Sequence, residues 1–112
     1  MEVKFSEAGQ AVVARIAGSI DGLTSDALQT ALSGELHKGH HKIVADFGGV
    51  DYISSAGVRV IIATVKEARR TGGDFRLAAL RPAVLRVLEM SGMVGIVKIH
   101  PDTDAAVAAF AA

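Results

Sequence analysis

The sequence contains no cysteine and no tryptophan, and only 4% of its 112 residues are aromatic. The absence of cysteine excludes a disulfide framework, a thiolate metal site and a cysteine nucleophile. There is also no excess of either charge, since 12 Lys and Arg residues balance 12 Asp and Glu residues. Nucleic acids and anionic membrane surfaces select clustered cations, so we expect neither as a partner of a neutral chain.

Long apolar runs are missing as well. No stretch reaches the length of about 18 apolar residues that a transmembrane helix needs, and residues 1–7 lack the apolar core of a signal peptide. We therefore expect no membrane insertion and a cytoplasmic location. Half of the residues are nevertheless hydrophobic. This composition predicts one domain over residues 1–112, able to bury a core without a metal or other cofactor.

Apolar periodicity predicts alternating strands and helices. Two strands flank a glycine turn and form a hairpin, and helical spacing with capping residues marks the later helices. The connection over residues 48–55 is expected to be irregular. The predicted elements are strands at 2–6, 11–17, 42–47, 74–79 and 95–100, and helices at 25–38, 56–71, 82–90 and 103–112.

The order β-β-α-β-α-β-α-β-α determines the expected fold class. Strand–helix–strand units with short connections form parallel pairs with right-handed crossovers, and the leading hairpin adds an antiparallel edge. We therefore predict an α/β fold, a small mixed sheet with helices mainly on one face.

The segment Val50–Val60, VDYISSAGVRV, joins the central strand to the second helix. It resembles the strand-to-helix signature of the STAS family, the sulfate-transporter and anti-sigma-factor-antagonist domains. Three further segments agree with the family in order and spacing, namely Gly18–Asp21, Gly72–Leu77 and Arg81–Met93. The resemblance covers nearly the whole chain. A stand-alone domain of this length resembles the bacterial anti-sigma factor antagonists more than a transporter tail.

The resemblance implies a partner-switching role in transcription regulation. The regulatory serine of the family opens this helix, two residues before the glycine, which here is Ser55. In antagonists of this kind, a serine-protein kinase that is itself the anti-sigma factor phosphorylates this serine, and a metal-dependent phosphatase reverses the modification; the resemblance implies the same for Ser55. The best-known members carry aspartate just before this serine, whereas this chain has Ser54. Ser54 is either a secondary phosphorylation site or a second hydroxyl in the same turn.

Physical chemistry alone leaves two readings of Ser55. A serine at a helix start lies beside unpaired N–H groups, where it is either a plain N-cap or a residue whose phosphate the helix terminus accommodates. The role of Asp21 also has two interpretations. By the resemblance its loop helps to present the regulatory serine to the kinase; otherwise it is a loop aspartate that caps the first helix.

Further partner-binding candidates lie on or just before the second helix. Arg59, Lys66 and Arg70 form a basic stripe, which is either a solvated face or an interaction surface; Arg59 is one turn from Ser55. Ile53 is either an exposed apolar contact or part of the core. Gly57 allows a close backbone approach at the first turn or simply packs there.

Catalytic and metal-binding readings have weaker support. A hydrolase nucleophile elbow needs glycine two residues before the serine, and that position is Ile53. His37 and His41 have a metal-binding spacing, but Gly39 is expected to end the helix between them. The alternatives to a phosphorylation-controlled antagonist are a STAS scaffold subunit of a membrane transport or other signalling assembly without phosphorylation control, and a small enzyme or ligand carrier. We expect a monomer.

Overall fold

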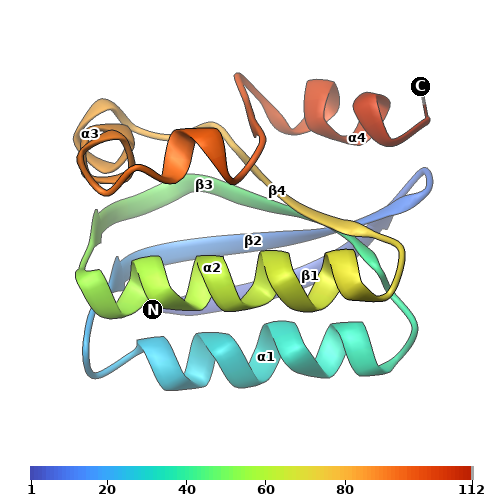
Figure 1. Ribbon diagram of the computed structural model, residues 1–112, viewed down its shortest axis with the longest axis horizontal. Coiled ribbons are helices and arrows are strands. Elements are labelled where there is room, and N and C mark those ends of the chain that lie inside the picture. Colours follow the sequence, from blue (N-terminus) through green and yellow to red (C-terminus); the bar gives the residue numbers. More distant parts are fainter. Residues whose placement is uncertain (112) are drawn as a thin grey trace.

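A computed structural model describes residues 1–111, which form a five-stranded sheet covered by helices (Figure 1). The strands are β1 (Glu2–Ala8), β2 (Ala11–Ile20), β3 (Lys42–Ile53), β4 (Asp74–Ala78) and β5 (Ile99–His100). The helices are α1 (Ser25–His37), α2 (Ser55–Arg70), α3 (Pro82–Met90), the 3-10 turn η1 (Met93–Gly95) and α4 (Thr103–Ala111). The sheet order is β1-β2-β3-β4-β5; β1 and β2 are antiparallel, and the other neighbours are parallel. The mixed α/β class is confirmed.

The predicted hairpin forms because its turn residue can adopt a left-handed conformation. Gly9 has a φ of +59°, which a residue with a side chain rarely adopts. The turn sets the pairing register, in which Phe5 lies opposite Ala14. β2 is buried on both faces from Ala11 to Ala14, as expected for a central strand. It runs to Ile20, three residues beyond the predicted end.

The helices cover both faces of the sheet (Figure 1). α1 and α2 lie side by side on one face, where the hydroxyl of Ser33 donates a hydrogen bond of 2.9 Å to Glu67. The larger apolar core takes side chains from α1, α2 and α3. A smaller cluster lies beneath α4, where Ala106 packs against Val13 and Val44. The sheet is therefore sandwiched between α1 and α2 on one face and α3 and α4 on the other, so the prediction of helices mainly on one face was wrong.

The predicted core face of α2 is largely confirmed. Val58, Ile61, Val65 and Ala68 are buried, as helical spacing requires. Ile62, which was expected in the same stripe, lies at its margin and is only partly buried. This packing determines which residues of α2 face outward.

The prediction for residues 48–53 was wrong, because β3 continues through them to Ile53. Gly48 and Gly49, which were expected in an irregular connection, lie instead in the strand beside a register shift in the pairing of β2 with β3. A Cβ at Gly49 would lie 3.0 Å from the Cβ of Ala17, so glycine lets the two strands approach closely here. The longer strand carries the chain directly to the start of α2.

The last strand was predicted too long. Only Ile99 and His100 pair with β4, and the preceding residues form η1 and an irregular stretch. The carbonyl oxygen of Ile96 accepts a 2.8 Å hydrogen bond from the guanidinium of Arg69. Before Ile99, the chain is thus held by this side-chain hydrogen bond and not by strand pairing with β4.

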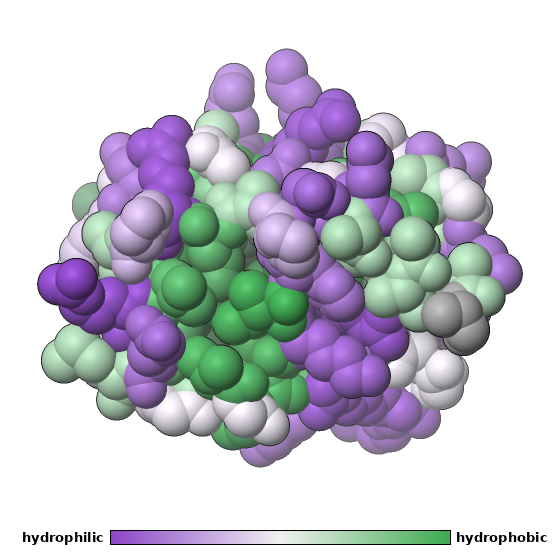
Figure 2. Space-filling model, turned by 90° about the horizontal axis from the view of Figure 1, so that it is seen from above, coloured by the Kyte–Doolittle hydropathy of each residue, from purple (hydrophilic) through white to green (hydrophobic). Residues whose placement is uncertain are grey.

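The face seen from above in Figure 2 carries an apolar patch over α3 and η1. The large exposed apolar side chains of this region are Met90, Val94 and Ile96. Across the described residues 1–111, none of the helices combines the length and the apolar character that crossing a membrane requires.

Candidate functional site

Ser54 and Ser55 take different positions at the start of α2. Ser54 is the N-cap, with extended backbone, and its side-chain oxygen accepts a hydrogen bond of 3.4 Å from the N–H of Gly57. Ser55 is the first helical residue and is exposed. Its hydroxyl makes no hydrogen bond to any other residue in the described part of the chain. Plain N-capping, which we considered for Ser55, is therefore the role of Ser54, and the hydroxyl of Ser55 faces solvent.

The loop between β2 and α1 lies against this turn. The backbone N–H of Ser54 donates a hydrogen bond of 2.8 Å to the carbonyl of Ile20, and Ile20 also pairs with Ile53 at the end of β3. The carboxylate of Asp21 accepts hydrogen bonds from the N–H groups of Leu23 (2.9 Å) and Thr24 (3.1 Å). Asp21 therefore orders the loop ahead of α1, and by doing so it holds this loop next to the Ser55 turn.

Two of the candidate residues support the turn from inside. A Cβ on Gly57 would come within 2.6 Å of Ile53 and 2.8 Å of Ile20, so only glycine permits this close approach of α2 to the sheet. Ile53 is only 2% exposed and belongs to the core. The alternative that Ile53 is an exposed contact is wrong, because β3 reaches the helix and directs this side chain inward.

The structure exposes two apolar side chains that the sequence analysis did not select. Leu23 is 94% exposed in the loop beside the turn, and Tyr52 is 53% exposed at the end of β3. Asp51, next to Tyr52, accepts a 3.0 Å hydrogen bond from the hydroxyl of Ser19 on β2. The sequence did hold a signal for Leu23. It is an isolated apolar residue between Gly22 and Thr24, and it belongs to no periodic apolar pattern of a helix or strand. The exposure of Tyr52 was not predicted, because its segment was expected to be irregular and not a strand.

Positive potential surrounds Ser55 from the helix side. The first turn of α2 contains no acidic residue, and the unpaired N–H groups of its terminus favour an anion. Arg59 is exposed and lies one turn further along the same face. Lys66, also exposed, is 11 residues from Ser55, about 16 Å along the helix axis. The structure thus brings Asp21, Ser54, Ser55 and Arg59 together at one end of the molecule, and Lys66 lies apart from them.

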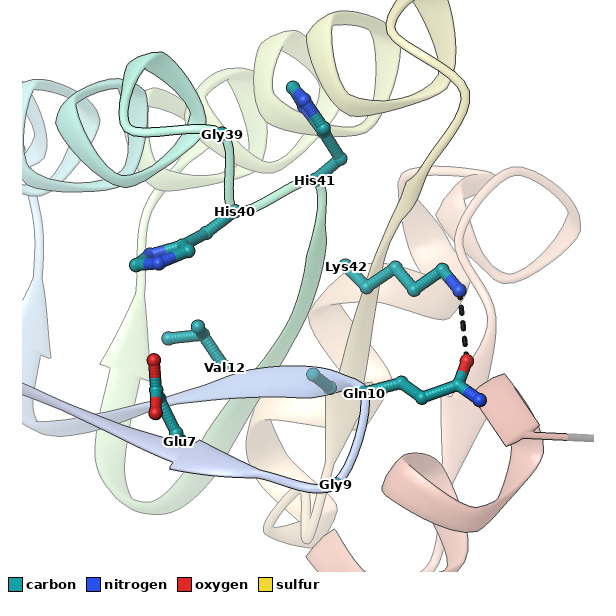
Figure 3. Close-up of a pocket in the computed structure, with 9 residues that line it drawn as sticks. Glu7, Gly9, Gln10, Val12, Gly39, His40, His41 and Lys42 are labelled. Atoms are coloured by element: carbon teal, nitrogen blue, oxygen red, sulfur yellow. Dashed lines mark hydrogen bonds between the residues drawn. The ribbon is translucent and has the colours of Figure 1, made fainter.

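A surface pocket lies at the opposite end of β3 and contains none of the predicted site residues (Figure 3). It has a volume of about 550 Å³ and is bordered by a hydrogen bond of 3.0 Å from Lys42 to Gln10. His40 points toward Glu7 and Val12, whereas His41 turns away from the pocket (Figure 3).

The histidines near this pocket do not form a metal site. His37 ends α1, and Gly39 follows with a φ of +92°, so His41 lies beyond the helix and outside its i, i+4 geometry. Within residues 1–111, no three or more His, Cys, Asp or Glu side chains are grouped to hold a metal ion. His40 instead approaches the buried carboxylate of Glu35, with 2.7 Å between Nδ1 and Oε2.

Comparisons with known proteins show the family of the chain. The family model of the STAS domain matches residues 2–106. BtrV of Bordetella bronchiseptica, described by its name as a candidate anti-sigma factor antagonist, is 33% identical over 98% of this chain and 95% of its own length.

Solved structures show the same fold. A candidate anti-sigma factor antagonist from Thermotoga maritima superposes with a TM-score of 0.93 at 23% identity, covering 98% of this chain and 95% of the other. The phosphorylated form of the Bacillus cell fate determinant SpoIIAA superposes with a TM-score of 0.74 at 19% identity, over 97% and 99% of the two chains.

Proposed function

The chain belongs to the STAS domain family, and from this premise we propose that it is an anti-sigma factor antagonist whose binding is switched off by phosphorylation of Ser55. The observation that carries the proposal is the exposed hydroxyl of Ser55 on the first turn of α2, free of any structural hydrogen bond among the described residues. The fold does not need this hydroxyl, so a kinase can modify it without breaking a native contact.

In the unmodified state, the surface around Ser55 suits a protein partner. Leu23 in the loop after β2 and Tyr52 at the end of β3 expose apolar area, and Asp21 holds the loop that carries Leu23. Aromatic and apolar side chains of this kind form the centre of protein interfaces. The anti-sigma factor would cover them and the Ser55 hydroxyl together, and thereby release the sigma factor that it holds.

Phosphorylation changes this surface without changing the fold. It adds roughly −1.5 to −2 charges and three acceptor oxygens to Ser55. The terminus of α2 accommodates an anion, so the domain itself tolerates the group. Docking, however, would have to desolvate the phosphate. The cost of several kcal/mol removes most of a micromolar affinity, which corresponds to about 8 kcal/mol.

The proposal assigns the catalytic steps to partners. A serine-protein kinase, which is the anti-sigma factor itself, binds the nucleotide and transfers the phosphate to Ser55. A metal-dependent serine phosphatase removes it. This chain acts in the cytoplasm as the binding module between them. A scaffold in a transport or signalling assembly would use the same surface without modification of Ser55.

Calorimetric titration against the purified anti-sigma factor tests the proposal. We expect Ser55-phosphorylated protein and Ser55→Asp to bind at least roughly a hundredfold more weakly than the unmodified chain. The matched control is Ser54→Asp, which places a charge at the neighbouring cap position and should bind within a few-fold of wild type. Equal affinity of the phosphorylated and unmodified forms would refute the switch, and so would a Ser55→Asp protein that fails to fold.

A further inference from the structure

Three cations form a line along the outer face of α2. Arg59, Lys66 and Arg70 are all exposed, and we call them the α2 basic stripe. At 3.6 residues per turn, Ser55 and the stripe fall within an arc of about 60° on the helix surface. This arc lies opposite the buried face of α2. The stripe therefore continues the surface on which Ser55 lies, over about 22 Å of helix axis from Ser55 to Arg70.

Four cations of the molecule pair with carboxylates, whereas the three cations of the stripe do not, and in the described residues Lys4, Arg86 and Lys98 share this lack without being aligned with Ser55 on one helix face. Arg15 pairs with Asp46, Lys38 with Glu35, and Arg69 and Arg76 both with Asp74. Within the described residues, the three stripe side chains make no ion pair and no side-chain hydrogen bond. Their positive charge is thus available to an external group.

The nearest acidic residue of α2 does not neutralise the stripe. The carboxylate of Glu67 is turned toward α1, where it accepts a 2.9 Å hydrogen bond from the hydroxyl of Ser33. A groove of about 230 Å³ lies between the two helices here, bordered by Gln29 and Ser33 on α1 and by Lys66, Glu67 and Arg70 on α2, with the Glu67 carboxylate bonded to Ser33. Ala63 also lines this groove. Two cations of the stripe, Lys66 and Arg70, therefore lie at its rim.

We infer that the α2 basic stripe docks an acidic face of the same anti-sigma factor that covers Ser55. The inference rests on the proposed function and extends its interface along α2. Exposed charges at the rim of an interface act mainly on association rate and salt dependence, and less on dissociation. The stripe would steer the factor along α2 toward Ser55, and a phosphate on Ser55 would weaken this attraction by placing negative charge on the same helix face.

An acidic protein face fits the stripe better than a nucleic acid does. The chain has a formal net charge of +0, and its cations are balanced elsewhere by acidic residues. Nucleic-acid binding draws its affinity from several phosphate contacts made by clustered cations, whereas this stripe offers three on a convex helix.

Charge reversal with a matched control tests the inference. The variant Lys66→Glu/Arg70→Glu reverses two stripe charges, and Arg86→Glu/Lys98→Glu reverses two exposed cations outside the stripe. At low ionic strength we expect the stripe variant to associate with the anti-sigma factor about tenfold more slowly than the control variant. The difference should shrink at about 0.5 M salt, where the Debye length is only a few ångströms. Equal association rates of the two variants would overturn the inference.

A defined probe separates this inference from the proposed function. In a titration of the isotope-labelled chain with poly-L-glutamate, we expect amide shifts at Arg59, Ala63, Lys66 and Arg70, and none in the stripe variant. Shifts spread evenly over the surface would contradict the stripe, and so would stronger binding of a DNA duplex to the same residues. If poly-L-glutamate selects the stripe but phosphorylation of Ser55 leaves partner binding unchanged, the proposed switch fails and the acidic docking surface stands.

Discussion

The adjacent serines at the start of α2 divide two tasks between them. Ser54 closes the helix by accepting a hydrogen bond from Gly57, while Ser55 points its hydroxyl into solvent. In the best-known relatives an aspartate stands at the position of Ser54. Aspartate and serine are both good N-caps, so the replacement keeps the structural task and removes one negative charge beside the hydroxyl that we propose to be regulatory.

This division predicts different stabilities for two alanine variants. Ser54→Ala should lower the free energy of unfolding by about 1 kcal/mol, because it removes the cap. Ser55→Ala should change it by less than about 0.5 kcal/mol, because an exposed hydroxyl without a partner contributes little. Urea denaturation followed by circular dichroism measures both. Equal losses in the two variants would mean that the cap is wrongly assigned.

Gly57 predicts a second stability effect, with a control in the other long helix. Gly57→Ala should destabilise the protein by about 1–3 kcal/mol, since the new methyl group would overlap the buried side chains of Ile53 and Ile20. Gly34→Ala adds the same methyl group on α1, where nothing lies within 4 Å of it. That variant should be stabilised by up to about 1 kcal/mol. Thermal unfolding of both proteins compares them directly, and a neutral Gly57→Ala would contradict the close approach.

Among the elements, α2 was the one that the sequence predicted best. Its apolar spacing is regular, so its core face and its outward cations followed from periodicity alone. The end of β3 was missed because Gly48 and Gly49 indicate a turn in isolation, and only pairing with β2 keeps them extended. The last strand was predicted too long because the carbonyl of Ile96, in the apolar run before β5, is bound by Arg69, a contact between residues far apart in the chain.

The carboxyl end of α1 predicts a dependence of stability on pH. Burial raises the pKa of Glu35, but hydrogen bonds and charges from His40 and Lys38 outweigh it, so that the pKa lies below its ordinary value of 4.5. The ionised carboxylate therefore stabilises the folded state. This contribution is fully present above pH 4.5 and is lost as the pH falls through the folded pKa.

The measurement is the free energy of unfolding of wild type and Glu35→Gln between about pH 5.5 and pH 3. The advantage of wild type over Glu35→Gln should shrink as the pH falls, because the variant lacks the titrating group. Glu89→Gln, on the exposed surface of α3, should show no such narrowing. A difference between wild type and Glu35→Gln that stays constant with pH would contradict the assignment.

For the molecule as a whole, the fold and the position of Ser55 could be predicted from the sequence, but the surface around it could not. Order and spacing of four segments indicated the family, and the family model matches residues 2–106. Leu23 and Tyr52 escaped notice because exposure depends on how the loop after β2 meets the end of β3. For the same reason the sequence could not decide whether Ile53 is exposed or buried. A shift of one residue in the strand register moves a side chain from one face of the sheet to the other.

The proposed phosphorylation site and the residues that hold its turn in place are different residues. The core, the Ser54 cap and the Gly57 contact hold the turn, while Ser55 carries no structural task. A modification there can change what the surface binds while the sheet and its helices stay as they are. This separation is the physical basis of the proposed partner switch.

The central claim is that Ser55 carries the regulatory phosphate, and intact-mass spectrometry with peptide mapping of the protein isolated from its native host tests it most directly. The account predicts a population heavier by one phosphate, with the group mapped to Ser55 and not to Ser54, and a phosphorylated fraction that changes with growth or stress conditions. A chain whose Ser55 stays unmodified under all of these conditions would contradict the account.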